Sequence, residues 1–229
     1  MTPEEKNQRL SDHLAQFISE HKKTSLEKVL ENRTRYITVV LEDIFQSQNA
    51  SAVVRTCECM GLQDIHVVES KSAYSVNKKV IKGANKWIDL IRYKAKASNN
   101  IGDCFKNLKE KGYRILVTEP DAEGSSIDEI LVTDQPLAIV MGNELDGASK
   151  YALQHADVKV KIPMYGFTES LNISVSAAIC LNTLVPKLRQ SAVDWQLSLA
   201  EKEFIRLQWY RKIVKRSEII EKEFLRSIE

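Results

Sequence analysis

The 229-residue sequence contains no apolar run of eighteen residues or more, which argues against a membrane-spanning helix. Its first sixteen residues, MTPEEKNQRLSDHLAQ, are polar and charged throughout, unlike the apolar core of a secretory signal peptide. Hydrophobic residues still make up 43% of the chain, which is enough to build a core. We therefore expect a cytoplasmic protein with no membrane partner.

Cysteine and histidine are both scarce, with four of each in the chain. The cysteines are Cys57, Cys59, Cys104 and Cys180, and none of them has the spacing of a zinc site. Cys57 and Cys59 are two residues apart in an expected helix, where they point to different sides and cannot share an ion or a disulfide. We expect four reduced, mostly buried thiols and no bound metal.

Glycine is also scarce, and neither glycine-rich phosphate loop is present. In the segment MGNELDG, residues 141–147, the glycines are five apart, and Ala148 and Ser149 follow where a phosphate loop needs Lys. Glu144 and Asp146 would repel a pyrophosphate, so the loop fits an uncharged or cationic ligand better than a nucleotide phosphate. A plain turn from strand to helix remains an equal alternative.

Charge is unevenly distributed although the net charge is only +2. Residues 71–114 hold twelve Lys or Arg and three acidic residues, whereas residues 119–149 hold eight acidic residues and no Lys or Arg. This asymmetry predicts a basic face for a polyanion such as RNA, or simply a set of solvated helix and strand faces.

The central residues alternate between strand-like and helix-like segments. We expect strands at 36–41, 65–69, 88–93, 113–118, 137–141 and 158–162, and helices at 50–60, 101–111, 148–155 and 173–188. Such alternation predicts an α/β fold with a mainly parallel sheet covered on both faces. Residues 4–33, with a break near 22–24, and residues from 195 onward are expected to be helical. We place an N-terminal extension at 1–35, the main domain at 36–190 and a C-terminal extension at 191–229.

Ligands of open α/β sheets bind beyond the carboxyl ends of the strands, so the loops after the strands are the places to search. After the first strand, Asn49 can cap a helix and Arg55 lies off its buried stripe. Arg55 could clamp a phosphate through two hydrogen bonds, or pair with Glu58 on the surface.

The third such loop, within IPMYGFTESLNISVSAAICL at 162–181, ends in a helix with small inner residues. Ser170, Asn172 or Ser174 can cap that helix. Ala177 and Ala178 lie with Ser174 on one face, which is expected to meet another helix, a backbone segment or a ligand.

Together these loops resemble the SpoU/TrmH family of RNA ribose 2′-O-methyltransferases, within the SPOUT superfamily. The segment from Asn49 to Arg55 with Gly61 is similar to the family's first motif, IVMGNELDG at 139–147 to its second, and 162–178 to its third. GANKW at 83–87 is similar to a segment that many members carry before the third strand. The resemblance implies a SPOUT fold with a deep trefoil knot in the C-terminal half of the sheet, a homodimer with the small-residue helix at its interface, and S-adenosylmethionine as cofactor.

The resemblance also implies roles for individual residues. The expected cofactor-binding residues are Thr118, Met141, Gly142, Asn143, Gly147, Ile162, Met164, Leu171 and Asn172. The expected catalytic residues are Arg55, which would orient the RNA phosphate and stabilise the developing alkoxide, with Asn49, Glu144, Ser170 and Asn172. The expected RNA-binding residues are Lys82, Lys86, Lys109, Arg211 and Lys212.

The terminal helical extensions resemble those of family members that methylate guanosine 18 in the D-loop of tRNA. Two segments depart from the tRNA members' pattern: FQSQ at 45–48 stands where His-Lys-Pro-His is common, and Leu145-Asp146 where Lys commonly follows Glu. We expect a tRNA (guanosine-2′-O-)-methyltransferase. The alternatives are a ribosomal-RNA 2′-O-methyltransferase and an RNA-binding protein that has lost catalysis.

Overall fold

The computed structural model describes residues 2–120, 124–133 and 135–228. It divides into an α/β unit, Thr34–Trp195, and a helical unit made of Met1–Arg33 and Gln196–Glu229. The two terminal segments, which the sequence led us to treat as separate extensions, therefore pack together as one unit. Within the described residues, no helix has the length and apolar character needed to cross a membrane.

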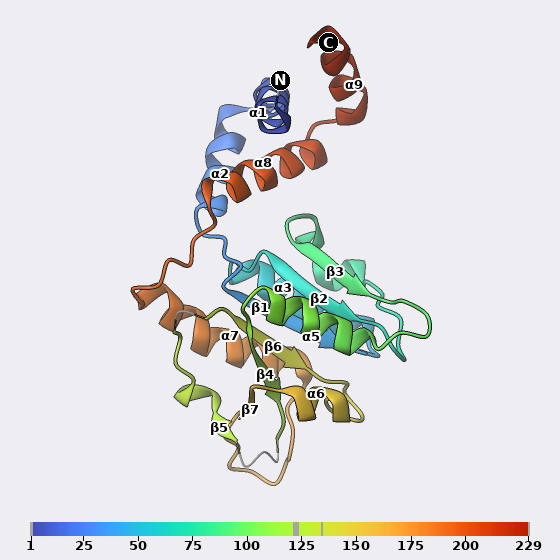
Figure 1. Ribbon diagram of the computed structural model, residues 1–229, viewed down its shortest axis with the longest axis vertical. Helices are drawn as coiled ribbons and strands as arrows, with labels where there is room; N and C mark the ends of the chain where they lie inside the picture. The colour runs from blue at the N-terminus through green and yellow to red at the C-terminus, as the bar shows by residue number, and fades with distance from the viewer. Residues whose placement is uncertain (1, 121–123, 134, 229) are drawn as a thin grey trace. The chain divides into compact units, whose positions relative to one another are not determined.

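One parallel sheet forms the centre of the α/β unit (Figure 1). Its strands in the described part of the chain are β1 (Ile37–Glu42), β2 (Asp64–Val68), β3 (Asp89–Tyr93), β4 (Arg114–Thr118), β5 (Ser125–Ser126), β6 (Leu137–Met141) and β7 (Val158–Lys161). They lie in the order β3-β2-β1-β6-β4-β7-β5, and every pairing is parallel. The predicted α/β class and the six predicted strands are confirmed, while β5 was not predicted. The trefoil knot stays a prediction.

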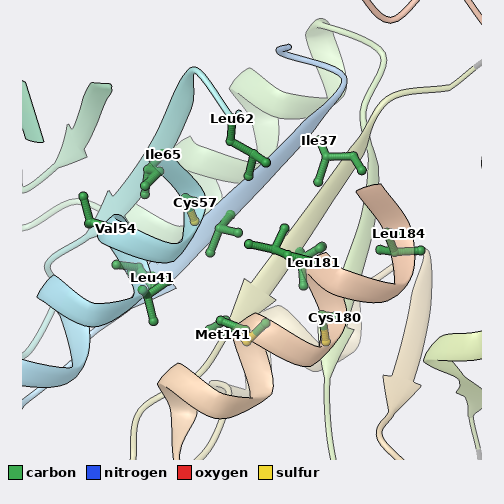
Figure 2. Packing of buried hydrophobic residues seen from close by; sticks show 14 of the residues in the cluster. Ile37, Leu41, Val54, Cys57, Leu62, Ile65, Met141, Cys180, Leu181 and Leu184 are labelled. Carbon is green, nitrogen blue, oxygen red and sulfur yellow. The ribbon is translucent and has the colours of Figure 1, made fainter. Parts of the chain in front are cut away.

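Helices cover the sheet on both faces, as the alternation of segments predicted. They are α3 (Ser47–Cys59), α4 (Lys78–Ile81), α5 (Asn100–Glu110), α6 (Lys150–His155) and α7 (Ile173–Gln190), with short 3-10 turns η1 (Ala84–Lys86) and η2 (Ile127–Glu129). Val39 and Leu41 of β1 pack in the cluster that holds α3 and α7, whereas Val40 packs with α5 and α6. This alternation follows from the two-residue period of a strand. Figure 2 shows side chains of α3 and α7 meeting those of the strands on one face.

The helical unit consists of α1 (Pro3–Ala15), α2 (Glu20–Leu30), α8 (Leu199–Ile213) and α9 (Ser217–Ile228). The break between the first two helices was predicted at 22–24, which is wrong because it lies at 16–19. Residues 22–24 contain no Gly or Pro, and the Thr24 hydroxyl donates to the Glu20 carbonyl inside α2 at 3.0 Å. Arg206 of α8 donates to both carboxylate oxygens of Glu27 in α2, at 2.6 and 2.8 Å, which fixes these two helices together.

A buried histidine lies on β2, next to the edge strand β3. His66 of β2 is 1% exposed, and its Nδ1 lies 3.0 Å from the Tyr93 hydroxyl on β3. Burial penalises the charged imidazolium and lowers the pKa of His66 from 6.5 to about 4. The nearby charge of Lys111 contributes to this lowering of the pKa. His66 is therefore neutral in the folded protein at physiological pH.

This histidine makes the stability of the α/β unit depend on pH. Between pH 6.5 and about 4 the unfolded chain binds a proton at His66 and the folded chain does not, so stability falls as the pH falls through this window. A pKa difference of this size corresponds to on the order of 3 kcal/mol. His66→Gln should remove that part of the pH dependence, as measured by urea unfolding at pH 7 and pH 4.5. Equal losses of stability in both proteins on acidification would contradict this assignment.

Candidate active site

A cavity of about 470 Å³ opens at the carboxyl ends of β4 and β6, where ligands of α/β sheets are expected. Seven of the predicted cofactor-binding residues line it, namely Thr118, Met141, Gly142, Asn143, Gly147, Leu171 and Asn172. Four of the five predicted catalytic residues line it as well, namely Asn49, Glu144, Ser170 and Asn172. The structure therefore brings residues from all three motif-like segments to one place.

A chain of hydrogen bonds joins those three segments. Asn172 Nδ2 donates to Asn49 Oδ1 at 3.1 Å, and Asn49 Nδ2 donates to Glu144 Oε1 at 2.8 Å. Asn49 is 8% exposed, so neither of its bonds is easily replaced by water. The Glu144 carboxylate also accepts from the backbone N–H groups of Phe45 at 3.1 Å and Gln46 at 3.4 Å, directly before α3. A carboxylate at this place is favoured by the positive end of the helix dipole.

The loop after β6 is closed on itself. The backbone N–H of Asn143 donates to the Gly147 carbonyl at 2.9 Å, and the reverse bond is 3.0 Å long. Gly142 lies tightly beneath this closure, because a Cβ added there would lie 2.2 Å from the Ala148 nitrogen. Since that neighbour is backbone, it could not move aside without opening the loop. Gly142 is therefore required by close backbone packing.

Two predicted helix caps have different outcomes. Asn172 is the N-cap of α7, where its Oδ1 accepts from the Ser174 N–H at 2.8 Å. The predicted capping role of Asn49 is wrong, because α3 begins at Ser47 with Gln46 as its N-cap. Asn49 lies inside the first turn and turns its side chain to Glu144 and Asn172. The sequence could not show that a partner from another loop would take up this amide.

Arg55 does not line the cavity. It is exposed on α3, six residues after Asn49, and its Nη1 lies 3.5 Å from the Val80 carbonyl of α4. A helix advances 100° per residue, so Arg55 and Asn49 point in directions about 120° apart. Within one chain, Arg55 is on the surface beside the site and not among the residues that enclose it.

One small residue of α7 packs inside the chain. Ala177 is fully buried in the cluster that contains α3, and α7 packs against α3. Ser174 and Ala178 are half-buried, so the dimer interface that the resemblance implies at this helix stays a prediction. Val175, on another face of α7, is 45% exposed.

Two of the predicted cofactor residues line a second cavity. Ile162 and Met164 border a space of about 360 Å³ after β7, and Pro120 lines both this cavity and the first. Pro120 was not predicted. The other lining residues that the sequence analysis missed are Gln46, Leu145, Ala148, Ile173 and Ser176. Each lies within four residues of a predicted one, so the position of the motifs was the only available signal.

Behind the cavity, a buried carboxylate was also missed. Glu42, at the end of β1, is 3% exposed and accepts from the Ser149 N–H at 3.0 Å. Burial raises the pKa of Glu42, and the hydrogen bonds with Ser149 oppose that rise. Glu42 therefore holds the start of α6 in place next to the loop after β6.

The predicted RNA-binding residues are dispersed. Lys82 and Lys86 are exposed near α4 and η1. Lys109 pairs with Asp157 at 3.4 Å. Asp157 directly precedes β7, so this pair lies at the amino ends of the strands, away from the cavity. Arg211 and Lys212 belong to α8 of the helical unit. There, Arg211 forms two hydrogen bonds with Glu221, at 2.6 and 3.0 Å. Their RNA-binding roles stay predictions.

The cysteines are free thiols, three of them buried. Burial raises the pKa values of Cys104 and Cys180 to about 12 and also raises that of Cys57, so these groups remain protonated at neutral pH. Cys59 is exposed. Within the described ranges, no three His, Cys, Asp or Glu residues lie together as a possible metal site.

Of the acidic residues counted in 119–149, Asp121, Glu123 and Asp134 lie outside the described residues.

Comparisons with known proteins identify the family of this chain. The model of the SpoU rRNA Methylase family matches residues 36–182. The chain is 45% identical, over 91% of its length and 93% of the relative's, to the tRNA (guanosine(18)-2′-O)-methyltransferase of Borreliella burgdorferi. It superposes with a TM-score of 0.75 on the TrmH/SpoU tRNA modifying enzyme of A. aeolicus, at 27% identity, covering 86% of this chain and 98% of that one. An AdoMet-bound rRNA methyltransferase of Sinorhizobium meliloti, 19% identical, shares the fold with a TM-score of 0.58, covering 73% and 61%. The chain therefore belongs to the SpoU rRNA Methylase family.

Proposed function

We propose that this chain is an S-adenosylmethionine-dependent 2′-O-methyltransferase that acts on the ribose of guanosine 18 in tRNA. The observation that carries the proposal is the joining of Asn49, Glu144 and Asn172, one from each motif, at the edge of a single cavity. The choice of tRNA is supported by the name of the 45% identical relative, which this chain matches over nearly its whole length.

The cavity fits S-adenosylmethionine in size and charge. Its volume lies within the range of about 300–1,000 Å³ that is common for small-molecule sites. None of the described lining residues is Lys or Arg, and Glu144 contributes a carboxylate, which suits a cationic sulfonium better than a phosphate. Gly142 and the closed 143–147 loop present backbone groups to the ligand. The seven predicted cofactor-binding residues on the lining would hold the cofactor. The bound cofactor would supply an electrophilic methyl group.

The polar residues at the edge of the cavity would orient the RNA ribose. Asn49 and Asn172 are held by their mutual hydrogen bond, and Ser170 lies exposed next to them. Groups held in place in this way lower the barrier because little reorganisation is needed when the methyl group is transferred. We assign to this group the positioning of the 2′-hydroxyl.

Arg55 would act on the RNA from outside the cavity. An Arg has a pKa above about 12, which makes proton abstraction by its neutral form costly, so we assign it to the target phosphate and to the developing alkoxide. Because a single chain leaves Arg55 on the surface, the RNA or a second copy of the chain must complete this part of the site.

We further propose a homodimer that covers the apolar surface near the site. Leu145, Tyr165 and Phe167 are 83%, 97% and 108% exposed, and all three lie in the loops after β6 and β7. Large, exposed apolar side chains in loops that border a cavity can mark a surface that binds another molecule. In this proposal the interface is formed by these loops and not by Ala177. The same segments would form the trefoil knot that the family resemblance implies.

The function can be tested with labelled S-adenosylmethionine and separate pools of tRNA and ribosomal RNA. Label is expected in tRNA, at the ribose of guanosine 18 when the methylated position is mapped. Label in ribosomal RNA alone would overturn the tRNA assignment. Failure to bind S-adenosylmethionine in calorimetry would overturn the methyltransferase assignment.

Arg55→Lys keeps the charge but loses the planar group that can hold a phosphate through two hydrogen bonds. At saturating RNA and cofactor, this variant should transfer methyl groups roughly 10- to 100-fold more slowly, with unchanged affinity for S-adenosylmethionine. Arg226→Lys, at an exposed position of α9, is the matched control. Full activity of Arg55→Lys would show that the two-bond clamp is wrong.

Gly142→Ala tests the cofactor site independently of RNA. The added Cβ would collide with the backbone of Ala148, so the 143–147 loop must open. Affinity for S-adenosylmethionine, measured by calorimetry, should fall at least about tenfold because the ligand loses preorganised backbone partners. Gly112→Ala is the control, since a Cβ there also meets nothing within 4 Å and Gly112 lies before the amino end of β4, away from the cavity. Equal affinities in both variants would exclude the 143–147 loop from cofactor binding.

A further inference from the structure

Asp43 connects the loop after β2 to the loop after β6. It follows β1 directly and is 7% exposed. Its Oδ1 accepts from three successive backbone N–H groups, those of Ser70 at 2.7 Å, Lys71 at 2.7 Å and Ser72 at 3.1 Å. Its backbone carbonyl accepts from Asn143 Nδ2 at 3.0 Å. One residue thus fixes both loops, and Asn143 lines the cofactor cavity.

The backbone of Asp43 has a conformation that few residues adopt. Its φ is +51°, in the left-handed region, where Asp and Asn are the most tolerant residues after Gly. The conformation directs one carboxylate oxygen to three donors at once, which is a charge-assisted arrangement that also orders the segment 70–72. This ordering requires a side-chain oxygen acceptor, because Gly could adopt the same φ but would offer none.

The ordered segment presents Lys71 beside the cofactor loop. The Lys71 ammonium lies 3.8 Å from Asp146 Oδ2, and both side chains are more than 70% exposed. An exposed ion pair of this kind contributes little to stability and is weakened by salt. An arriving RNA phosphate could therefore replace Asp146 as the partner of Lys71 at little cost.

The surroundings extend this basic surface toward Arg55. Lys71 begins the basic segment 71–86, in which the Asn77 N–H donates to Ser51 Oγ of α3 at 2.8 Å. Val80 of the same segment accepts from Arg55. The segment is therefore attached at one end to the cofactor loop through Asp43 and in its middle to the helix that carries Arg55.

We propose that Lys71 binds an RNA phosphate next to the cofactor cavity and that Asp43 is the positioning residue that holds Lys71 there. The proposal rests on the RNA methyltransferase function above and identifies a contact of the same substrate. Asp43 itself would contact neither the RNA nor the cofactor. Its effect on RNA binding passes through the backbone of 70–72.

A double-mutant cycle with tRNA tests this pathway. Lys71→Gln should raise the KM for tRNA about three- to tenfold, with kcat and the Kd for S-adenosylmethionine unchanged, because only a phosphate contact is lost. Asp43→Gly keeps the backbone conformation, removes the acceptor and should raise the KM at least as much. The double variant should be no worse than Asp43→Gly alone, since the two residues act in series. Additive effects, or an unchanged KM in Lys71→Gln, would overturn the proposal.

Two further measurements separate positioning from general damage. Asp43→Asn retains an oxygen acceptor and tolerates the same φ, so it should restore most of the tRNA affinity. Hydrogen exchange at the amides of 70–72 should speed up in Asp43→Gly and much less in Asp43→Asn. Failure of Asp43→Asn to restore affinity, or unchanged exchange in Asp43→Gly, would contradict the role of the side-chain oxygen as an acceptor for the backbone of 70–72.

Salt dependence identifies the phosphate contact without requiring catalysis. In tRNA binding, Lys71→Gln and Asp43→Gly should each reduce the slope of log Kd against log salt by about one. Lys22→Gln, at an exposed position of α2 outside the basic stretch 71–114, should leave both the slope and the KM unchanged. If wild-type protein binds no S-adenosylmethionine and transfers no methyl group, the proposed function itself fails. If wild-type protein is active but Lys71→Gln keeps its normal slope, only the present inference fails.

Discussion

The site depends on two hydrogen bonds that Asn49 makes with other loops, beside its local bond to Gln46. Its amide nitrogen donates to Glu144 and its amide oxygen accepts from Asn172, which connects the helix after β1, the loop after β6 and the cap of α7. Only a primary amide has a donor and an acceptor on the two branches of one short side chain. Glu144 and Asn172 lie 95 and 123 residues from Asn49 in sequence, so this one side chain joins the cavity edge across long stretches of the chain.

The cavity lining and the neighbouring segment 71–86 carry opposite charge. The described cavity lining carries Glu144 and no basic residue, which suits a cationic methyl donor. The neighbouring segment 71–86 is basic, which suits the RNA backbone. Asp43 joins the two regions, because its carboxylate accepts from the backbone of Lys71 and its carbonyl accepts from Asn143. A cationic ligand in the cavity and an RNA phosphate on the segment 71–86 could therefore bind side by side.

The fold could largely be predicted from the sequence because apolar strand segments and amphipathic helices are local patterns. The successive apolar residues Val39, Val40 and Leu41 predict a strand buried on both faces, and the structure confirms it. The predicted helix cap was wrong because long-range partners decide there. Asn49 has the chemistry of a cap, but its side chain is bound by Glu144 and Asn172 from other loops. Asp43 was missed because its importance lies in backbone donors 27–29 residues away.

The Asn49–Glu144 hydrogen bond holds the edge of the proposed cofactor cavity together. Exchanging its donor and acceptor tests this role most directly. Asn49→Asp removes the donor and places two carboxylates together, so calorimetry should show at least about a tenfold loss of affinity for S-adenosylmethionine. Adding Glu144→Gln to that variant supplies a donor from the other side and should restore most of the affinity. Wild-type affinity in Asn49→Asp, or no recovery in the double variant, would contradict the account.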